Sequence, residues 1–168
     1  MLGLEPRYEI DRAQIERAYR QRLAGAHPDA GGGEGESHDP ASLNRARSLL
    51  LSDEHRANAL LGVLGGPDAA DCKDLPDGFL MQMMMQRQEI EEAIESGGEP
   101  DREHWEQWGI EQRRAYAARV GRLFAALTGS SDAAGLREIR VQLNAWRYIE
   151  RLIEQLDPEY DAAKADFR

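Results

Sequence analysis

The chain has 168 residues, a formal net charge of −10 and a single cysteine, Cys72. This length allows one domain or two small ones. One cysteine excludes an internal disulfide and a cysteine-based metal cluster. An acidic chain would repel a phosphate backbone overall, so we expect no nucleic-acid partner.

The sequence also argues against a membrane location. No stretch approaches the roughly 18 apolar residues that a membrane span needs. Residues 1–5 carry neither a basic segment nor a long apolar run, so they do not predict a signal peptide. We expect a cytoplasmic protein with no membrane partner.

Residue composition predicts an all-α protein. Valine, isoleucine and threonine are sparse, and strict alternation of apolar and polar residues is nearly absent. A first helix around residues 2–4 is short, if it forms at all, and residues 6–8 form a turn. Asp11 with Gln14 three residues later is a capping-box variant that begins the next helix, and Gly25 suits its end. One face of this helix is apolar: Ile15, Tyr19 and Leu23.

Glycine and proline divide the rest of the chain. Residues 30–40 contain four glycines and a proline, which predicts a loop. Helices are then expected over about 41–52 and, after a brief break, up to residue 64. Residues 67–78 are a linker rich in Gly, Pro and Asp. Beyond it, helices are expected over about 76–96, 101–128 (with an irregularity near Gly109) and 132–156. Short connections join them, which favours an antiparallel three-helix bundle.

The tripeptide His27-Pro28-Asp29 is the most informative motif. Pro28 has no N–H and biases His27 away from helical geometry, so the tripeptide ends the preceding helix. That helix carries a basic set: Arg12, Arg17, Arg20 and Arg22. The motif and the arginines would form a polar, partly cationic surface suited to an acidic or polar groove on a partner protein. Taken alone, the tripeptide is more typical of an ordinary helix end than of a binding motif.

In this context the N-terminal segment resembles a J-domain, the module that stimulates ATP hydrolysis by a partner chaperone. The tripeptide follows a basic helix and precedes a loop and a leucine-rich helix. Before this helix the chain reads Leu-Gly-Leu, then Pro-Arg-Tyr, then Ile-Asp. This order of segments is similar to the start of HscB, the J-domain co-chaperone of iron–sulfur cluster assembly. The resemblance implies an HscA/DnaK-type chaperone as one partner. Its contact residues would be His27, Pro28, Asp29, Arg17, Arg20 and Arg22.

The segment that begins at Phe79-Leu80-Met81 carries the resemblance into the second half. By helical spacing, one apolar stripe is expected to be core: Phe79, Met83, Ile90 and Ile94. A second stripe exceeds what the core needs and is typical of a partner site, although burial of the helix on two sides would also explain it. HscB proteins bind the IscU scaffold with this bundle. The resemblance implies these scaffold contacts: Leu80, Met81, Met84, Met85, Gln88, Glu92 and Tyr148.

The expected organisation is therefore a J-domain over residues 1–66 (a helical hairpin with flanking short helices), the linker 67–78, and a scaffold-binding three-helix domain over 79–168. The resemblance implies a co-chaperone that stimulates the chaperone ATPase and delivers the scaffold to it. Two alternatives stay open: a general J-domain protein for another client, and a J-like adaptor that triggers no hydrolysis. No carboxylate pair, nucleophile set or phosphate-binding loop indicates an enzyme, a metal site or a cofactor of its own.

Overall fold

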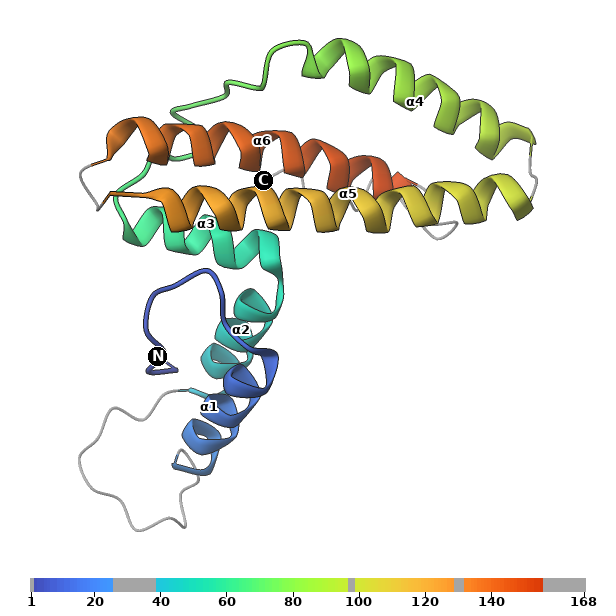
Figure 1. Cartoon of the computed structure of the whole chain (residues 1–168). Helices are drawn as coiled ribbons and strands as arrows, with labels where there is room; N and C mark the ends of the chain where they lie inside the picture. The colour runs from blue at the N-terminus through green and yellow to red at the C-terminus, as the bar shows by residue number, and fades with distance from the viewer. Residues whose placement is uncertain (1, 26–38, 97–98, 129–131, 156–168) are drawn as a thin grey trace. The chain divides into compact units, whose positions relative to one another are not determined.

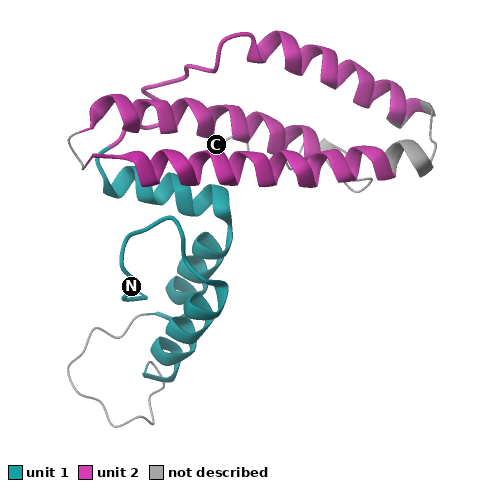
Figure 2. Ribbon diagram, viewed as in Figure 1, with its two compact units in different colours: residues 1–65 teal, residues 66–168 magenta. Residues whose placement is uncertain are grey.

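The computed structural model describes residues 2–25, 39–96, 99–128 and 132–155. These residues form six α-helices, and no strand occurs among them. The chain divides into two compact units, residues 1–65 and residues 66–168 (Figure 2). The all-α fold class predicted from the sequence is confirmed.

The first unit contains α1 (Arg12–Gly25), α2 (Pro40–Leu51) and α3 (Asp53–Val63). Helices α1 and α2 lie side by side as a hairpin (Figure 1). Polar side chains mark the helix starts, because they accept hydrogen bonds from backbone N–H groups that have no partner within the helix. The residues that do so are Asp11 for α1, Asp39 for α2 and Ser52 for α3. Ser52 has extended backbone, so it also ends α2.

The start of the chain differs from the sequence-based expectation, because residues 2–11 form no helix. Gly3 has a φ of +71°, in the left-handed region that favours glycine. A Cβ added there would lie 2.8 Å from Nη2 of Arg22, so the guanidinium lies against this backbone. The Gln14 side chain does not act as expected for a capping box. It accepts a hydrogen bond from the Arg7 side chain at 2.9 Å.

The hairpin is held by an apolar centre and a polar pair. Leu2, Ile15 and Leu43 form its buried core. Glu16 on α1 accepts hydrogen bonds from Nε and Nη2 of Arg47 on α2 at 2.5–3.0 Å. These bonds hold the pKa of the Glu16 carboxyl below its ordinary value, with desolvation opposing them. These contacts fix α1 against α2. The loop that connects the two helices, residues 26–38, lies outside the described residues.

The second unit contains α4 (Phe79–Ser96), α5 (Glu99–Ala126) and α6 (Ala133–Gln155), which run antiparallel in succession (Figure 1). Helix α4 begins after a turn at Asp77 and Gly78, three residues later than the expected start at Pro76. Helix α5 continues through Gly109, where an irregularity was expected. A Cβ added at Gly109 would lie 3.0 Å from Cγ1 of Ile153, so the glycine allows α5 and α6 to approach closely.

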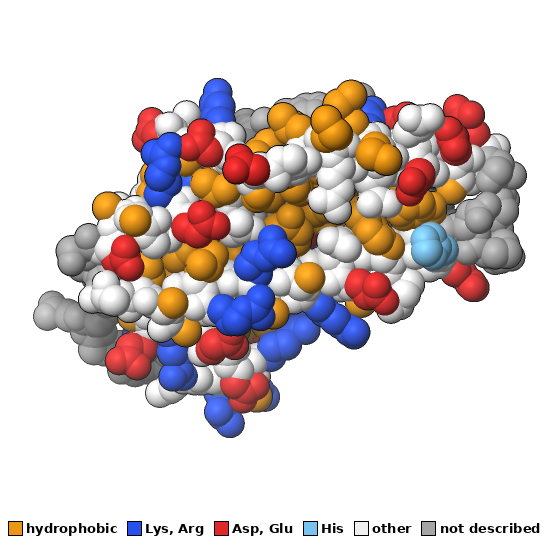
Figure 3. Space-filling view, turned by 45° about the horizontal axis from the view of Figure 1, so that its top comes forward, with side chains coloured by type: hydrophobic (Ala, Val, Ile, Leu, Met, Phe, Trp, Pro, Cys, Tyr) orange, Lys and Arg blue, Asp and Glu red, His pale blue; other side chains and the backbone are white. Residues whose placement is uncertain are grey.

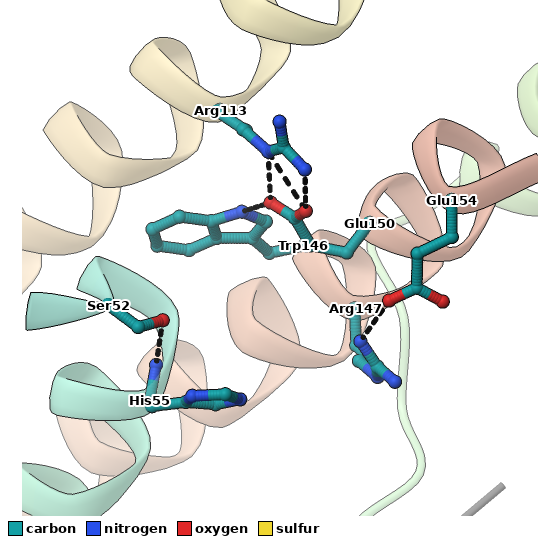
Figure 4. Close-up of polar contacts among 7 residues, drawn as sticks. All are labelled: Ser52, His55, Arg113, Trp146, Arg147, Glu150 and Glu154. Atoms are coloured by element: carbon teal, nitrogen blue, oxygen red, sulfur yellow. Dashed lines mark hydrogen bonds and ion pairs between the residues drawn. The ribbon is translucent and has the colours of Figure 1, made fainter. Parts of the chain in front are cut away.

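Helices α5 and α6 are joined by a polar contact beside aromatic packing. Glu150 on α6 accepts hydrogen bonds from Arg113 on α5 and, at 2.9 Å, from the indole N–H of Trp146 (Figure 4). The buried ring of Trp146 stacks on Tyr116 of α5 with a centroid separation of 6.2 Å. Trp105 on α5 is also buried. Trp105 and Trp146 are thus part of the packed interior of this unit.

Candidate protein-binding surfaces

Helix α4 presents an exposed apolar surface, which we call the methionine face. Its members are Leu80, Met81, Met84 and Met85, with exposed fractions of 51%, 73%, 74% and 63%. Hydrophobic side chains gather along this helix in the space-filling view (Figure 3). Contiguous exposed apolar side chains mark interaction sites more often than isolated ones do. The alternative expectation, in which α4 is buried on two sides, is wrong.

The opposite side of α4 is packed into the second unit. Phe79, Met83 and Ile90 are buried, as expected, while the side chain of Ile94 lies outside the described part. The rings of Phe79 and of Tyr148 on α6 pack edge to face, with centroids 5.9 Å apart. Tyr148 itself is 41% exposed. Burial of one stripe therefore orients the methionine face outward and places an aromatic side chain of α6 near the start of α4.

Charged and amide side chains continue the exposed surface toward the C-terminal end of α4. Gln88 donates a hydrogen bond to Glu92 at 3.0 Å, and Arg87 pairs with Glu91 at 2.7 Å. All four side chains are exposed. Such i,i+4 pairs hold side chains in place but contribute little to stability at the surface. The surface thus changes from apolar to acidic along the helix.

The segment before α4 is fastened to α6 by contacts that the sequence analysis did not foresee. Asn144 donates hydrogen bonds to the carbonyls of Cys72 at 2.8 Å and Asp74 at 3.0 Å. Arg140, which is buried, donates to the carbonyl of Pro67 at 3.0 Å, and Arg137 pairs with Asp74. Arg140 and Asn144, each next to a buried apolar residue of α6 in the sequence, were the available signal. These contacts fix the chain that leads into the methionine face.

The basic surface of α1 is described only in part. Arg17 and Arg20 are exposed and, three residues apart, share one side of the helix. Arg22 is exposed on another side, with its guanidinium beside Gly3. His27, Pro28 and Asp29 lie outside the described residues. The structure thus brings Arg17 and Arg20 together and separates them from Arg22.

Other features of the described residues indicate no further site. Among them, no group of three or more His, Cys, Asp or Glu side chains could hold a metal ion. None of the helices, within the described ranges, is both long and apolar enough to cross a membrane. Cys72 is buried and lies in the segment along α6.

The fold and the exposed face define an all-α protein in which a helical-hairpin unit precedes a three-helix unit. Residues 75–157 match the family model described as the HSCB C-terminal oligomerisation domain. The chain is 28% identical over 142 residues to a co-chaperone protein HscB homolog from Cupriavidus taiwanensis, covering 80% of each. It is 26% identical over 171 residues to another from Shewanella loihica, covering 96% of each.

Solved structures share the fold. The chaperone HscB from Vibrio cholerae has a TM-score of 0.69 and 21% identity, with 92% of this chain and 91% of that chain covered. The human co-chaperone protein HscB has a TM-score of 0.69 and 20% identity, with 92% and 77% covered. The family-model match and these relatives show that the chain is similar to HscB co-chaperones over most of its length.

Proposed function

We propose that this protein stimulates ATP hydrolysis by an HscA/DnaK-type chaperone and delivers an IscU-type scaffold protein to it during iron–sulfur cluster assembly in the cytoplasm. The observation that carries the proposal is the methionine face, uncovered on a helix whose other side is packed. The nucleotide, its magnesium ion and the cluster belong to the partners. In this proposal no residue of this chain catalyses a reaction.

The scaffold would bind the second unit at α4. The long, unbranched methionine side chains can adapt their shape to a partner, and burying apolar surface favours association. Leu80, Met81, Met84 and Met85 supply the apolar centre, with Tyr148 beside them. Gln88 and Glu92 supply a polar and acidic rim, which favours a partner with basic groups opposite them.

The chaperone would bind the first unit. Arg17, Arg20 and Arg22 are exposed cations on α1, and the chain continues from that helix toward His27, Pro28 and Asp29. Exposed arginines steer association with an acidic surface and contribute more to the rate of encounter than to affinity. Support for this half of the proposal comes from the motif and the family. The division into a chaperone-binding segment 1–66 and a scaffold-binding segment 79–168 is part of the same proposal.

The decisive experiment measures the ATPase rate of the purified chaperone with this protein, with the scaffold, and with both. We expect the combination to exceed the sum of the separate stimulations, because one protein would hold both partners. Stimulation without scaffold binding would instead identify a general J-domain protein for another client. Scaffold binding without stimulation would identify an adaptor.

A further inference from the structure

We propose that Met81, Met84 and Met85 form a modification site, at which peroxide oxidation to methionine sulfoxide weakens binding of the protein partner. The effect on binding rests on the proposed function, in which the methionine face contacts the scaffold. The modification itself rests only on the positions of the sulfur-bearing side chains. The two parts can therefore be tested separately.

Exposure separates the methionines of α4 into two classes. Met81, Met84 and Met85 have exposed fractions of 73%, 74% and 63%, whereas Met83, on the same helix, has 7%. Oxidation requires a peroxide to reach the sulfur, so its rate follows exposure. Three of the five methionines of the chain lie on this one face. The face should therefore react before the packed side of the same helix does.

The reaction is a two-electron oxygen transfer that is complete with hydrogen peroxide. A sulfur lone pair attacks one peroxide oxygen, the O–O bond breaks and an S–O bond forms. The other oxygen leaves as water after taking up the proton of the transferred oxygen. The thioether is oxidised to the sulfoxide, the peroxide is reduced, and a sulfoxide reductase with a thiol reductant reverses the change.

The product changes the chemistry of the whole surface. A sulfoxide oxygen is a strong hydrogen-bond acceptor, and it must lose its water when a partner covers it. Met84 and Met81 are three residues apart, and Met85 and Met81 four, so the oxidised groups share one side of α4. An adaptable apolar surface then becomes a polar one. Because these side chains are exposed, the helix itself should keep its fold.

The first measurement maps the oxidation. The full chain is treated with hydrogen peroxide for increasing times, quenched and digested, and oxygen incorporation is read by mass spectrometry. We expect Met81, Met84 and Met85 to gain oxygen at least about tenfold faster than Met83. Equal rates at Met83 and its exposed neighbours in protein that remains helical by circular dichroism would overturn the modification site.

The second measurement compares binding of the purified cognate scaffold before and after oxidation. We expect the dissociation constant to rise at least about tenfold and to recover after treatment with methionine sulfoxide reductases. The control is the Met81→Leu/Met84→Leu/Met85→Leu variant, which has no oxidisable sulfur on this face, so its own dissociation constant should be the same before and after peroxide. Oxidation of Cys72 would weaken binding of this variant too, so the comparison assigns the effect to the methionines.

The outcomes distinguish this inference from the proposed function. Unchanged affinity after complete oxidation of the three methionines would refute the effect on binding alone. Failure of the untreated chain to bind the scaffold would refute the proposed function, and with it the effect on scaffold binding. The oxidation map is obtained in either case and decides the modification site by itself.

Discussion

At the residue scale, Arg56 is a buried charge that ties the first unit together. Its guanidinium donates hydrogen bonds to the carbonyls of Tyr8 at 2.8 Å and Leu50 at 2.5 Å, and it pairs with Asp53. It also lies 5.2 Å from the centroid of the Tyr8 ring. One side chain therefore joins α3 to the end of α2 and to the segment before α1. Arginine is rarely buried without such partners.

Arg56→Met should destabilise the protein by about 2–4 kcal/mol, because it removes a buried side chain and the hydrogen bonds that it donates to the carbonyls of Tyr8 and Leu50. Urea unfolding followed by far-UV circular dichroism measures this change. Arg45→Met is the matched control, since Arg45 is exposed on α2. It should change stability by no more than about 0.5 kcal/mol. Equal effects of the two substitutions would contradict the structural role of Arg56.

The contact of Arg47 with Glu16 makes stability depend on pH. Because the pKa of Glu16 is lower in the folded than in the unfolded chain, its contribution is present above the unfolded pKa of about 4.3. It is lost as the pH falls through the folded pKa. The difference in unfolding free energy between wild type and Glu16→Gln should therefore shrink from neutral pH into this acid range. Denaturant titrations at several pH values test it, and a constant difference would count against the contact.

At the scale of the element, α4 combines a packed side and a free side. Neighbouring residues provide the sharpest comparison, since Met83 is 7% and Met84 is 74% exposed. Both changes to alanine have the same effect on helix propensity, so that contribution cancels. Any difference in stability between the two variants then reports burial.

Met83→Ala should destabilise the protein by about 2–4 kcal/mol, because it leaves a cavity in the packed side. Met84→Ala should change stability by no more than about 0.5 kcal/mol. The tryptophans at 105, 108 and 146 all lie in the second unit, so urea unfolding followed by their fluorescence measures the relevant part of the chain. A large loss in Met84→Ala would show that the methionine face is covered within the protein itself.

At the scale of the whole molecule, the proposed roles are assigned to separate units. The methionine face belongs to residues 66–168, whereas the basic helix α1 belongs to residues 1–65. Each unit has its own buried side chains. Substitutions on the surface of one unit should therefore leave the other unit folded, which makes the two proposed activities separable.

His27→Gln should abolish stimulation of the chaperone ATPase while scaffold affinity is unchanged. Leu80→Ala/Met84→Ala should weaken scaffold binding at least about tenfold, because apolar anchors at the centre of an interface contribute most of its affinity. That variant should keep the stimulation seen without scaffold. ATPase assays and scaffold titrations on the same preparations measure both activities. Parallel loss of both activities in either variant would contradict the division of roles.

Local signals in the sequence were enough to predict the helices. Asp11 and Ser52 accept hydrogen bonds from backbone N–H groups two and three residues later, so they place helix starts without knowledge of the rest of the chain. The expected helices lie within a few residues of those in the structure, and the apolar spacing correctly predicted Phe79, Met83 and Ile90 as core. The short helix considered at residues 2–4 does not form, because the fold holds Gly3 at positive φ beside Arg22.

By itself the sequence determined the all-α class and the presence of two apolar stripes on α4, since both depend on the order of residues along a helix. Only the tertiary structure decided which stripe is covered, because burial depends on neighbours far away in the chain. The same reason explains Arg56 and Asn144, whose most distant partners lie 48 and 72 residues away along the chain. Helical periodicity describes a face, whereas packing determines whether that face stays free for a partner.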